Sequence, residues 1–275
     1  DLDTLPANFL ISKLKGKPLI YDSHEYFTEV PELINRKFVK GIWELLEKMM
    51  LPHIKYAYTV SNSIAEVYTA KYGTGFKVVR NISANKSEPL HKQTNEKIIL
   101  YQGALNKGRG LQKAVMAMSF VKGAKLVIAG DGPIRNELSL LIDKLELGKK
   151  VQMTGRMSIE ELTGLTPTAS AGISLEEGPA LNYRYALPNK LFDYIQAQIP
   201  VIVSNMPEMA ALVNRYRIGL VISSHEPAEL GKAFNTLLFD IKQREIWKKN
   251  LKNAAKELNW ENEKKVLQDI FKKFI

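Results

Sequence analysis

Six short apolar runs, separated by helix-length segments, recur from residue 97 to residue 222 and limit the folds open to this chain. The runs are Ile98–Tyr101, Leu126–Ala129, Val151–Met153, Gly172–Leu175, Val201–Val203 and Gly219–Ile222. Between them, apolar residues lie three and four positions apart, as expected for amphipathic helices. Uninterrupted apolar strands that alternate with such helices indicate a parallel sheet covered on both faces. Because crossover connections are right-handed, we predict a doubly wound α/β sheet.

Sheets of this kind bind ligands just beyond the carboxyl ends of their strands. The loop after the first run, residues 102–110, contains three glycines, of which Gly103 is the first. It also contains two cations, Lys107 and Arg109. Glycines let the backbone approach a ligand closely, and cations beside a helix N-terminus favour phosphate. A plain strand–helix turn would have the same composition, so this loop alone does not decide. After the second run, the sequence beginning at Gly130 favours a tight turn over a phosphate site.

The connection after the fourth run is the most informative loop. It covers about a dozen residues, whereas strand-to-helix connections usually have about 2–6. A long polar loop at the ligand-binding edge of a sheet indicates function more often than a surface excursion. We expect a helix to begin at Pro188-Asn189, with its free N–H groups and Lys190 available to a diphosphate. The loop's other polar side chains include Glu176, Glu177, Asn182 and Arg184.

The first 95 residues predict part of a second α/β domain. Three short strands are expected, beginning near Pro18, Ala57 and Lys77, with a helix over Lys37–Met50 and an N-cap at Ser61. The segment opens with a helical stretch and not a strand, so we expect its opening units to be missing. We therefore predict a partial N-terminal domain over 1–90, a linker over 83–96 and a complete C-terminal domain over 91–257. The last helix, 258–275, is expected to cross back to the first domain.

The net charge of +10 requires an anionic partner or reflects a solubilising surface. Nucleic acid, anionic lipid and a phosphorylated small molecule all fit. Many of the lysines fall in the last helices, interleaved with Glu and Asn and not with aromatic residues. That pattern disfavours a groove for single-stranded nucleic acid and leaves a membrane surface open. These lysines are Lys248, Lys249, Lys252, Lys256, Lys264, Lys265, Lys272 and Lys273.

The chain contains no cysteine, which excludes disulfides, thiolate catalysis and cysteine metal sites. No two of the four histidines have the spacing of a metal-binding motif. We therefore expect no metal or other cofactor held by the protein. His24 follows the first expected strand, beside Asp22 and Glu25, where a solvated turn histidine is the alternative to a functional one.

Together these segments resemble the GT-B glycosyltransferases of family 4, over nearly the whole chain. The resemblance implies two Rossmann-like domains, the second holding a nucleoside diphosphate sugar. No single motif is decisive, but their order and spacing are specific. The segments that carry the resemblance are Tyr21 to Glu25, Val60-Ser61, Val79 to Asn81, Gly103 to Gly110, Gly130 to Pro133, Val151 to Met157, Glu177-Gly178, Pro188 to Tyr194, Pro200 to Ile202 and Trp260-Glu261.

The resemblance also implies roles for individual residues. Arg109 stands where the family has a lysine that binds the donor diphosphate. Glu177 would bind hydroxyls of the sugar, and Asp193 would bind the ribose. His24 would reach the transferred sugar, so His24, Arg109 and Glu177 form the expected catalytic set. The other expected donor-binding residues are Gly103, Gly130, Arg156 and Met157 (beside the base), Glu176, Asn182, Pro188, Asn189 and Lys190.

Three departures from the family pattern alter this expectation. Ala104 stands where the family usually has a phosphate-binding arginine, so one cation is missing, and Arg184 or Lys190 are candidates to replace it. Asp193 is one methylene shorter than the family's glutamate. The 16 positions from Glu177 to Asp193 are about twice the usual separation, so the donor loop is rebuilt and the donor cannot be carried over.

We therefore expect a retaining glycosyltransferase that uses a nucleotide sugar and a glycan or lipid-linked acceptor, in bacterial cell-surface polysaccharide synthesis. It would be cytoplasmic, at the inner face of a membrane, with no nucleic-acid partner. A sugar-nucleotide epimerase of the same fold is one alternative. The other is a non-catalytic nucleotide-sugar-binding module, which fits Ala104 and the incomplete first domain.

Overall fold

The computed structural model describes residues 1–82 and 96–274, so the expected linker lies, except for Glu96, outside the described residues. The chain divides into two compact units. The N-terminal unit comprises residues 1–81, 178–187 and 261–275, and the C-terminal unit comprises residues 82–177 and 188–260. Residues 178–187, which we assigned to the second domain, thus group with the first.

The C-terminal unit is built on a six-stranded parallel sheet in the order β6-β5-β4-β7-β8-β9. Chain order reverses direction at β4, which pairs with both β5 and β7, so the switch point of the doubly wound sheet lies between β4 and β7. All six expected strands are present. Their bounds are β4 Lys97–Gln102, β5 Ala124–Ala129, β6 Val151–Gly155, β7 Ala171–Ser174, β8 Val201–Ser204 and β9 Gly219–Ile222.

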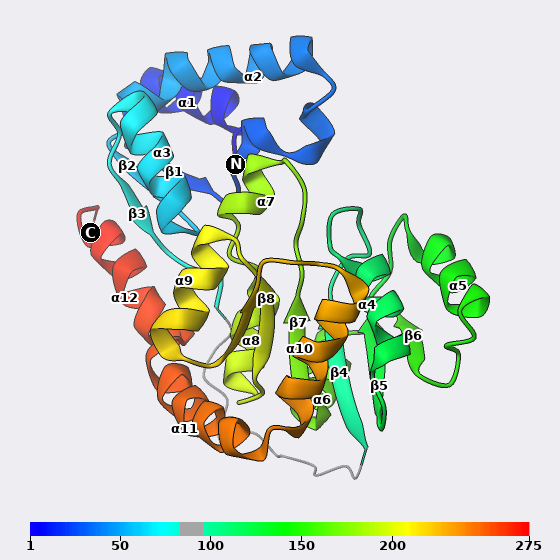
Figure 1. The fold of residues 1–275 in the computed structure, drawn as a ribbon. Helices are drawn as coiled ribbons and strands as arrows, with labels where there is room; N and C mark the ends of the chain where they lie inside the picture. The colour runs from blue at the N-terminus through cyan, green and yellow to red at the C-terminus, as the bar shows by residue number, and fades with distance from the viewer. Residues whose placement is uncertain (83–95, 275) are drawn as a thin grey trace. The chain divides into compact units, whose positions relative to one another are not determined.

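Helices cover both faces of this sheet (Figure 1). One group packs α4 (Leu111–Ala117) against α5 (Arg135–Lys144) and α10 (Pro227–Phe239), and the other packs α11 (Ile241–Glu257) against α8 (Asn189–Gln196) and α9 (Pro207–Tyr216). The four inner strands β4, β5, β7 and β8 are largely buried, which explains why they appear in the sequence as continuous apolar runs and not as alternating patterns. The remaining helix of the unit, α6 (Ile159–Leu165), begins at a capping box formed by Ser158 and Glu161.

The N-terminal unit holds a three-stranded parallel sheet in the order β1-β2-β3. The strands are slightly offset from the expected positions, while the helix expected over Lys37–Met50 has those bounds. Ser61 caps its helix as predicted, accepting a hydrogen bond from the N–H of Ile64 at 3.4 Å. The elements are α1 Leu5–Lys15, β1 Ile20–Ser23, α2 Lys37–Met50, β2 Tyr56–Thr59, α3 Asn62–Tyr72, β3 Phe76–Val78, α7 Leu181–Tyr185 and α12 Trp260–Phe271, of which residues 261–271 belong to this unit.

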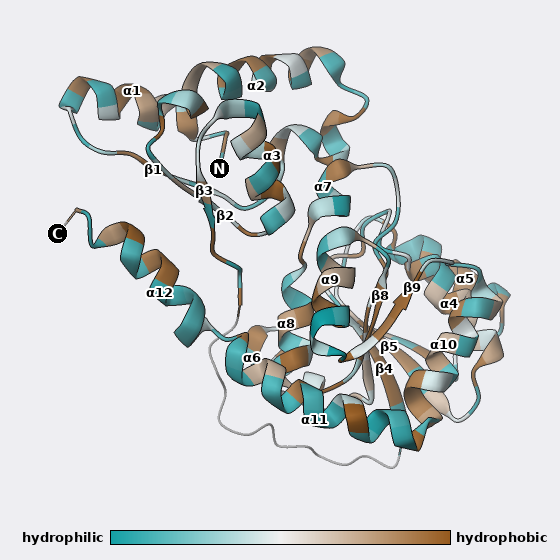
Figure 2. Cartoon of the chain, turned by 60° about the vertical axis from the view of Figure 1, so that its left-hand side comes forward, coloured by the Kyte–Doolittle hydropathy of each residue, from teal (hydrophilic) through white to brown (hydrophobic). Residues whose placement is uncertain are grey.

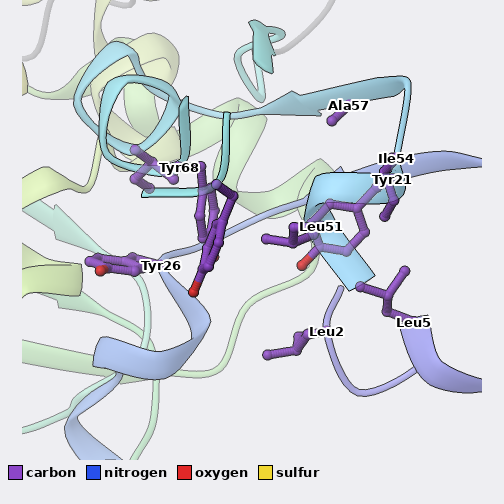
Figure 3. Packing of buried hydrophobic residues seen from close by; sticks show 10 residues of the cluster. Leu2, Leu5, Tyr21, Tyr26, Leu51, Ile54, Ala57 and Tyr68 are labelled. Atoms are coloured by element: carbon purple, nitrogen blue, oxygen red, sulfur yellow. The ribbon is translucent and has the colours of Figure 1, made fainter. Parts of the chain in front are cut away.

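Figure 3 shows the apolar core of the N-terminal unit. Leu2 and Leu5 come from the start of the chain, Tyr21 from β1, Leu51 from the turn after α2 and Tyr68 from α3. Two later segments also join this unit. Leu181 and Tyr185 of α7 pack against the core, and Glu263 of α12 accepts hydrogen bonds from the backbone N–H and the guanidinium of Arg80.

The helix α7 is an element that we did not predict. Its five residues are too few to form a stable helix alone, so its stability must come from packing. Asn182, which is buried in this helix, accepts a hydrogen bond from the N–H of Tyr26 at 3.0 Å and donates one to the Glu25 carboxylate at 3.1 Å. The hydroxyl of Ser61 donates to the carbonyl of Tyr185 at 2.9 Å. Contacts with residues distant in the sequence therefore hold this helix.

Candidate functional site

A buried cluster of opposite charges lies at the switch point of the C-terminal sheet. The Glu176 carboxylate, two residues beyond β7, has no exposed surface. Its Oε1 accepts hydrogen bonds from Arg109 Nη1 at 2.9 Å and from Lys190 Nζ at 2.7 Å. Arg109 follows β4 and Lys190 lies in the first turn of α8, so the fold brings together three segments that are distant in the sequence.

The electrostatics of this cluster keep Glu176 ionised. Burial raises the pKa of the carboxyl group, but attraction by Lys190 and Arg109 and hydrogen bonds from Lys190 and Ser174 outweigh burial and lower the pKa to about 2. Burial lowers the pKa of the Lys190 ammonium, and Glu176 opposes that shift. Within this cluster, one buried carboxylate therefore faces two cations.

The pKa of Glu176 predicts a contribution to acid stability. Because the folded-state pKa lies below the usual value of 4.5, this contribution is present above pH 4.5 and is lost as the pH falls towards 2. The full difference corresponds to about 3 kcal/mol. We expect the free energy of unfolding, measured by urea denaturation between pH 6 and pH 3, to fall less steeply in Glu176→Gln than in the wild type. If the free energy of unfolding falls equally steeply with decreasing pH in the two proteins, this assignment is contradicted.

The loop after β4 approaches this cluster closely. The ammonium of Lys190 lies 4.5 Å from the centre of the Tyr101 ring, a cation–π contact, and the Tyr101 hydroxyl donates to the carbonyl of Ala104 at 2.7 Å. The N–H of Glu177 donates to the carbonyl of Gly108 at 2.8 Å, which ties the loop after β7 to the loop after β4. The glycine-rich loop over residues 102–110 thus lies beside Glu176 and Lys190.

Two glycines are required where these loops pack. At Gly130, a Cβ atom would lie 1.9 Å from the carbonyl oxygen of Gly103, and φ is 153°. At Gly110, where φ is 67°, a Cβ would lie 2.3 Å from the carbonyl oxygen of Leu175. No side chain fits at either position without a backbone shift.

Gly130→Ala is therefore expected to lower the free energy of unfolding by about 2 kcal/mol, since the loops after β4 and β5 must separate. Gly148→Ala is the matched control, because nothing lies within 4 Å of the added Cβ there. Urea denaturation of both variants tests this expectation. If the two variants have equal free energies of unfolding, the loops after β4 and β5 can separate without loss of stability, and the prediction is wrong.

The structure places the other expected donor residues at the same sheet edge. Asp193 accepts a hydrogen bond from the Gln102 amide at 2.8 Å, and Gln102 also accepts one from Thr166 at 2.9 Å. Pro188 precedes the first residue of α8, Asn189, so the helix begins where we predicted. Gly103, Gly130, Arg156 and Met157 follow β4, β5 and β6.

Three expected residues lie in the N-terminal unit. His24 Nε2 lies 3.1 Å from the Asp22 carboxylate, which also accepts a hydrogen bond from Tyr58. Asn182 is held within α7 as described above. Arg184, one of the two cations considered as replacements at position 104, is exposed in that helix. Of the two, Lys190 is the cation that the structure places in the C-terminal cluster.

Sequence reasoning did not include several residues that complete the site. Ser174 donates to Glu176 Oε2 at 2.7 Å, Tyr101 lies under Lys190, and the buried Tyr194 hydroxyl donates to the carbonyl of Leu100 at 3.1 Å. The spacing of Ser174 and Glu176 was a usable signal, because residues two apart in an extended segment point to the same side. Among residues 1–82 and 96–274, no group of three or more His, Cys, Asp or Glu side chains is arranged to hold a metal ion.

Comparison with protein families gives a match to the family described as "Glycosyl transferases group 1" over residues 83–254, well over half of the chain. An uncharacterised glycosyltransferase of Methanocaldococcus jannaschii is 26% identical over 184 residues, which cover 66% of this chain and 46% of that protein. The chain thus spans about half the length of that relative.

A second relative matches a larger share of the chain. It is the Campylobacter jejuni enzyme named GalNAc-alpha-(1->4)-GalNAc-alpha-(1->3)-diNAcBac-PP-undecaprenol alpha-1,4-N-acetyl-D-galactosaminyltransferase. It is 26% identical over 268 residues, which cover 93% of this chain and 67% of that enzyme.

A similar solved structure is the Anabaena protein HepE in complex with UDP. It aligns with a TM-score of 0.79 and 16% identity, covering all of this chain and 76% of HepE. At this identity the likeness establishes the fold, and the expected GT-B architecture is confirmed.

Proposed function

Because this chain belongs to the group 1 glycosyl transferases, we propose that its C-terminal unit binds a nucleoside diphosphate sugar and that the protein transfers the sugar to a glycan or lipid-linked acceptor. The observation that carries this proposal is the pairing of Arg109 and Lys190 through buried Glu176 at the switch point of the sheet. Two cations held around one carboxylate suit a ligand that brings its own negative charge.

In this proposal, Arg109 and Lys190 bind the diphosphate. Lys190 supplies the positive charge of the family's phosphate-binding arginine, which is Ala104 in this chain. The N-terminus of α8 adds its partial positive charge. The glycines at 103 and 130 let the backbone approach the phosphates. Glu177 binds hydroxyls of the sugar, and Asp193, already held by Gln102, binds the ribose.

Negative charge builds on the nucleoside diphosphate as the glycosidic bond breaks. Cations fixed before the reaction stabilise that charge more in the transition state than in the ground state. Glu176 fixes both cations, so its role is to position them. Retention of the anomeric configuration and a contact of His24 with the transferred sugar are proposals that rest on the family resemblance.

For the acceptor, we propose a lipid-linked or polysaccharide glycan at the cytoplasmic face of a bacterial membrane. The name of the Campylobacter relative includes an undecaprenol diphosphate carrier, and the net charge of +10 favours an anionic surface. None of the described helices is both long enough and apolar enough to cross a bilayer.

The test is incubation with UDP-, GDP- and ADP-sugars, with and without a lipid-linked glycan, followed by mass spectrometry and chromatography of the sugars. The proposal predicts a product that requires both donor and acceptor. An epimerised donor formed without acceptor would identify the epimerase alternative. Saturable donor binding with no product under any condition would identify a non-catalytic binding module. That alternative is the second candidate because Ala104 stands where the family usually has a phosphate-binding arginine.

A further inference from the structure

The side chain of Gln102 is a polar exception among the strands of the C-terminal sheet. Figure 2 shows β4, β5 and β8 largely in the hydrophobic colour, yet β4 ends at Gln102, a glutamine with 5% of its surface exposed. Burial of an amide costs free energy unless its donors and its acceptor are paired. The partners of Gln102 therefore indicate what this side chain does.

Both ends of the Gln102 amide are paired with side chains. Its Nε2 donates to Asp193 Oδ2 at 2.8 Å, and its Oε1 accepts from the Thr166 hydroxyl at 2.9 Å. An ionised carboxylate only accepts hydrogen bonds and the hydroxyl can donate, so the two partners favour one orientation of the amide. Thr166 is itself buried, and its hydroxyl also lies 2.7 Å from the carbonyl oxygen of Leu162. Thr166 thus orients Gln102, and Gln102 orients Asp193.

The backbone at Gln102 is tied to the same turn of α8. The N–H of Gln102 donates to the Tyr194 hydroxyl at 3.2 Å, and that hydroxyl donates to the carbonyl of Leu100 at 3.1 Å. A Cβ atom at Gly172 would lie 2.4 Å from the Tyr194 ring, so the ring packs directly on the backbone of β7. Two consecutive residues of α8, Asp193 and Tyr194, are therefore fixed to the end of β4.

A second buried glutamine of α8 shows what a purely structural amide does. The Nε2 of Gln196 donates to the backbone carbonyls of Ala255 and Leu258, at 3.1 and 2.7 Å, which fastens α8 to the end of α11. Gln102 instead holds the side chain of Asp193, which is partly exposed. An amide that fixes an exposed carboxylate at the ligand-binding edge of a sheet suits a role in ligand binding.

Asp193 lies on the same side of α8 as Lys190. The two residues are three apart, so they are neighbours on the helix surface and lie about 4.5 Å apart along its axis. Lys190 is one of the two cations proposed to bind the diphosphate, and in a nucleotide the ribose is joined directly to the diphosphate. A fixed carboxylate at this distance suits the vicinal hydroxyls of the ribose, which can both donate to it.

We infer that Gln102, oriented by Thr166, is a positioning residue that fixes the Asp193 carboxylate for the ribose hydroxyls of the donor nucleotide. The nucleotide then meets a carboxylate that is already in its binding orientation, so less conformational entropy is lost on binding. Removal of the hydroxyls leaves this carboxylate without the donors that the ligand supplies, so the two side chains determine how strongly a ribonucleotide is preferred to its deoxy analogue. This inference rests on the proposed function and extends it to two residues outside the expected donor-binding set.

The test is isothermal titration calorimetry of the full chain with UDP, GDP and ADP, each compared with its 2′,3′-dideoxy analogue. In the wild type, we expect the nucleotide that binds to do so about 30-fold more tightly than its analogue. In Gln102→Leu, this ratio should fall to about threefold, because the ribonucleotide binds more weakly while the analogue binds as before. The ratio is measured within one protein, so a loss of stability in a variant does not change it.

Three further variants separate positioning from packing. Thr166→Val, which keeps the shape and removes the hydroxyl, should lower the ratio to about tenfold, and Thr166→Ser, which keeps the hydroxyl, should restore it. Gln196→Leu is the matched control, because it removes an equally buried amide of α8 whose acceptors are backbone carbonyls, and it should keep the wild-type ratio. If circular dichroism shows that Gln102→Leu does not fold, the two Thr166 variants carry the comparison.

Equal affinities of the wild type for a nucleotide and its dideoxy analogue would overturn the inference, as would a wild-type ratio in both Gln102→Leu and Thr166→Val. A ratio lost equally in Gln196→Leu would also overturn it, since the packing of α8 and not the Gln102 amide would then determine the preference. In all three cases the wild type still binds a nucleoside diphosphate, so the proposed function stands. A wild type that binds none of the nucleotides would overturn the proposed function and this inference with it.

Discussion

Glu176→Gln is expected to lower the free energy of unfolding by about 3–5 kcal/mol, because it leaves buried Lys190 and partly buried Arg109 without their common carboxylate. Urea denaturation at neutral pH measures the loss. Glu177→Gln is the matched control, since the neighbouring carboxylate is partly exposed and should change stability by less than about 0.5 kcal/mol.

A double-mutant cycle sharpens this prediction. Lys190→Met alone leaves Glu176 with Arg109, while Glu176→Gln/Lys190→Met removes both buried charges of the shorter ion pair. We expect the double variant to lose less stability than the sum of the single variants, because no unpaired buried ammonium remains. Strict additivity would mean that the two side chains do not stabilise one another.

Arg109→Ala is expected to weaken the binding of a nucleoside diphosphate about 100-fold, the amount lost with charge-assisted hydrogen bonds to phosphate. Isothermal titration calorimetry measures it, with Lys107→Ala as the control. Lys107 is an exposed cation of the same loop, and its removal should change affinity less than about threefold. A folded Arg109→Ala protein with wild-type affinity would remove Arg109 from the proposed diphosphate site.

The sequence was most informative where burial is complete. Every strand of the C-terminal sheet was predicted, and the inner strands β4, β5, β7 and β8 were predicted because strands covered on both faces are continuous apolar runs. The start of α8 was predicted at Pro188-Asn189, and Pro188 is the extended N-cap residue directly before the helix. These signals are local, so they need no knowledge of distant contacts.

The parts that the sequence did not reveal depend on long-range contacts. No local signal predicts α7, because Asn182 and Tyr185 are held by Tyr26, Glu25 and Ser61, more than a hundred residues away. The same applies to Glu176. Two adjacent glutamates are equivalent in sequence, and only the fold places one of them between Arg109 and Lys190.

The second apolar side of α2 was hidden for a related reason. The sequence predicted an amphipathic helix over Lys37–Met50, but apolar residues cover a wide arc of it. Periodicity alone cannot say which part of that arc is buried. The structure separates Trp43 and Met50, which pack inside, from Phe38 and Leu45, which do not.

The central claim is that the switch point of the C-terminal sheet binds a nucleoside diphosphate through Arg109 and Lys190. Calorimetric titration of the full chain with UDP, GDP and ADP tests it most directly. The account predicts saturable 1:1 binding of at least one of them in the wild type and binding about 100-fold weaker in Arg109→Ala. A folded wild-type protein that binds none of the three, or that binds one equally well without Arg109, would contradict the account.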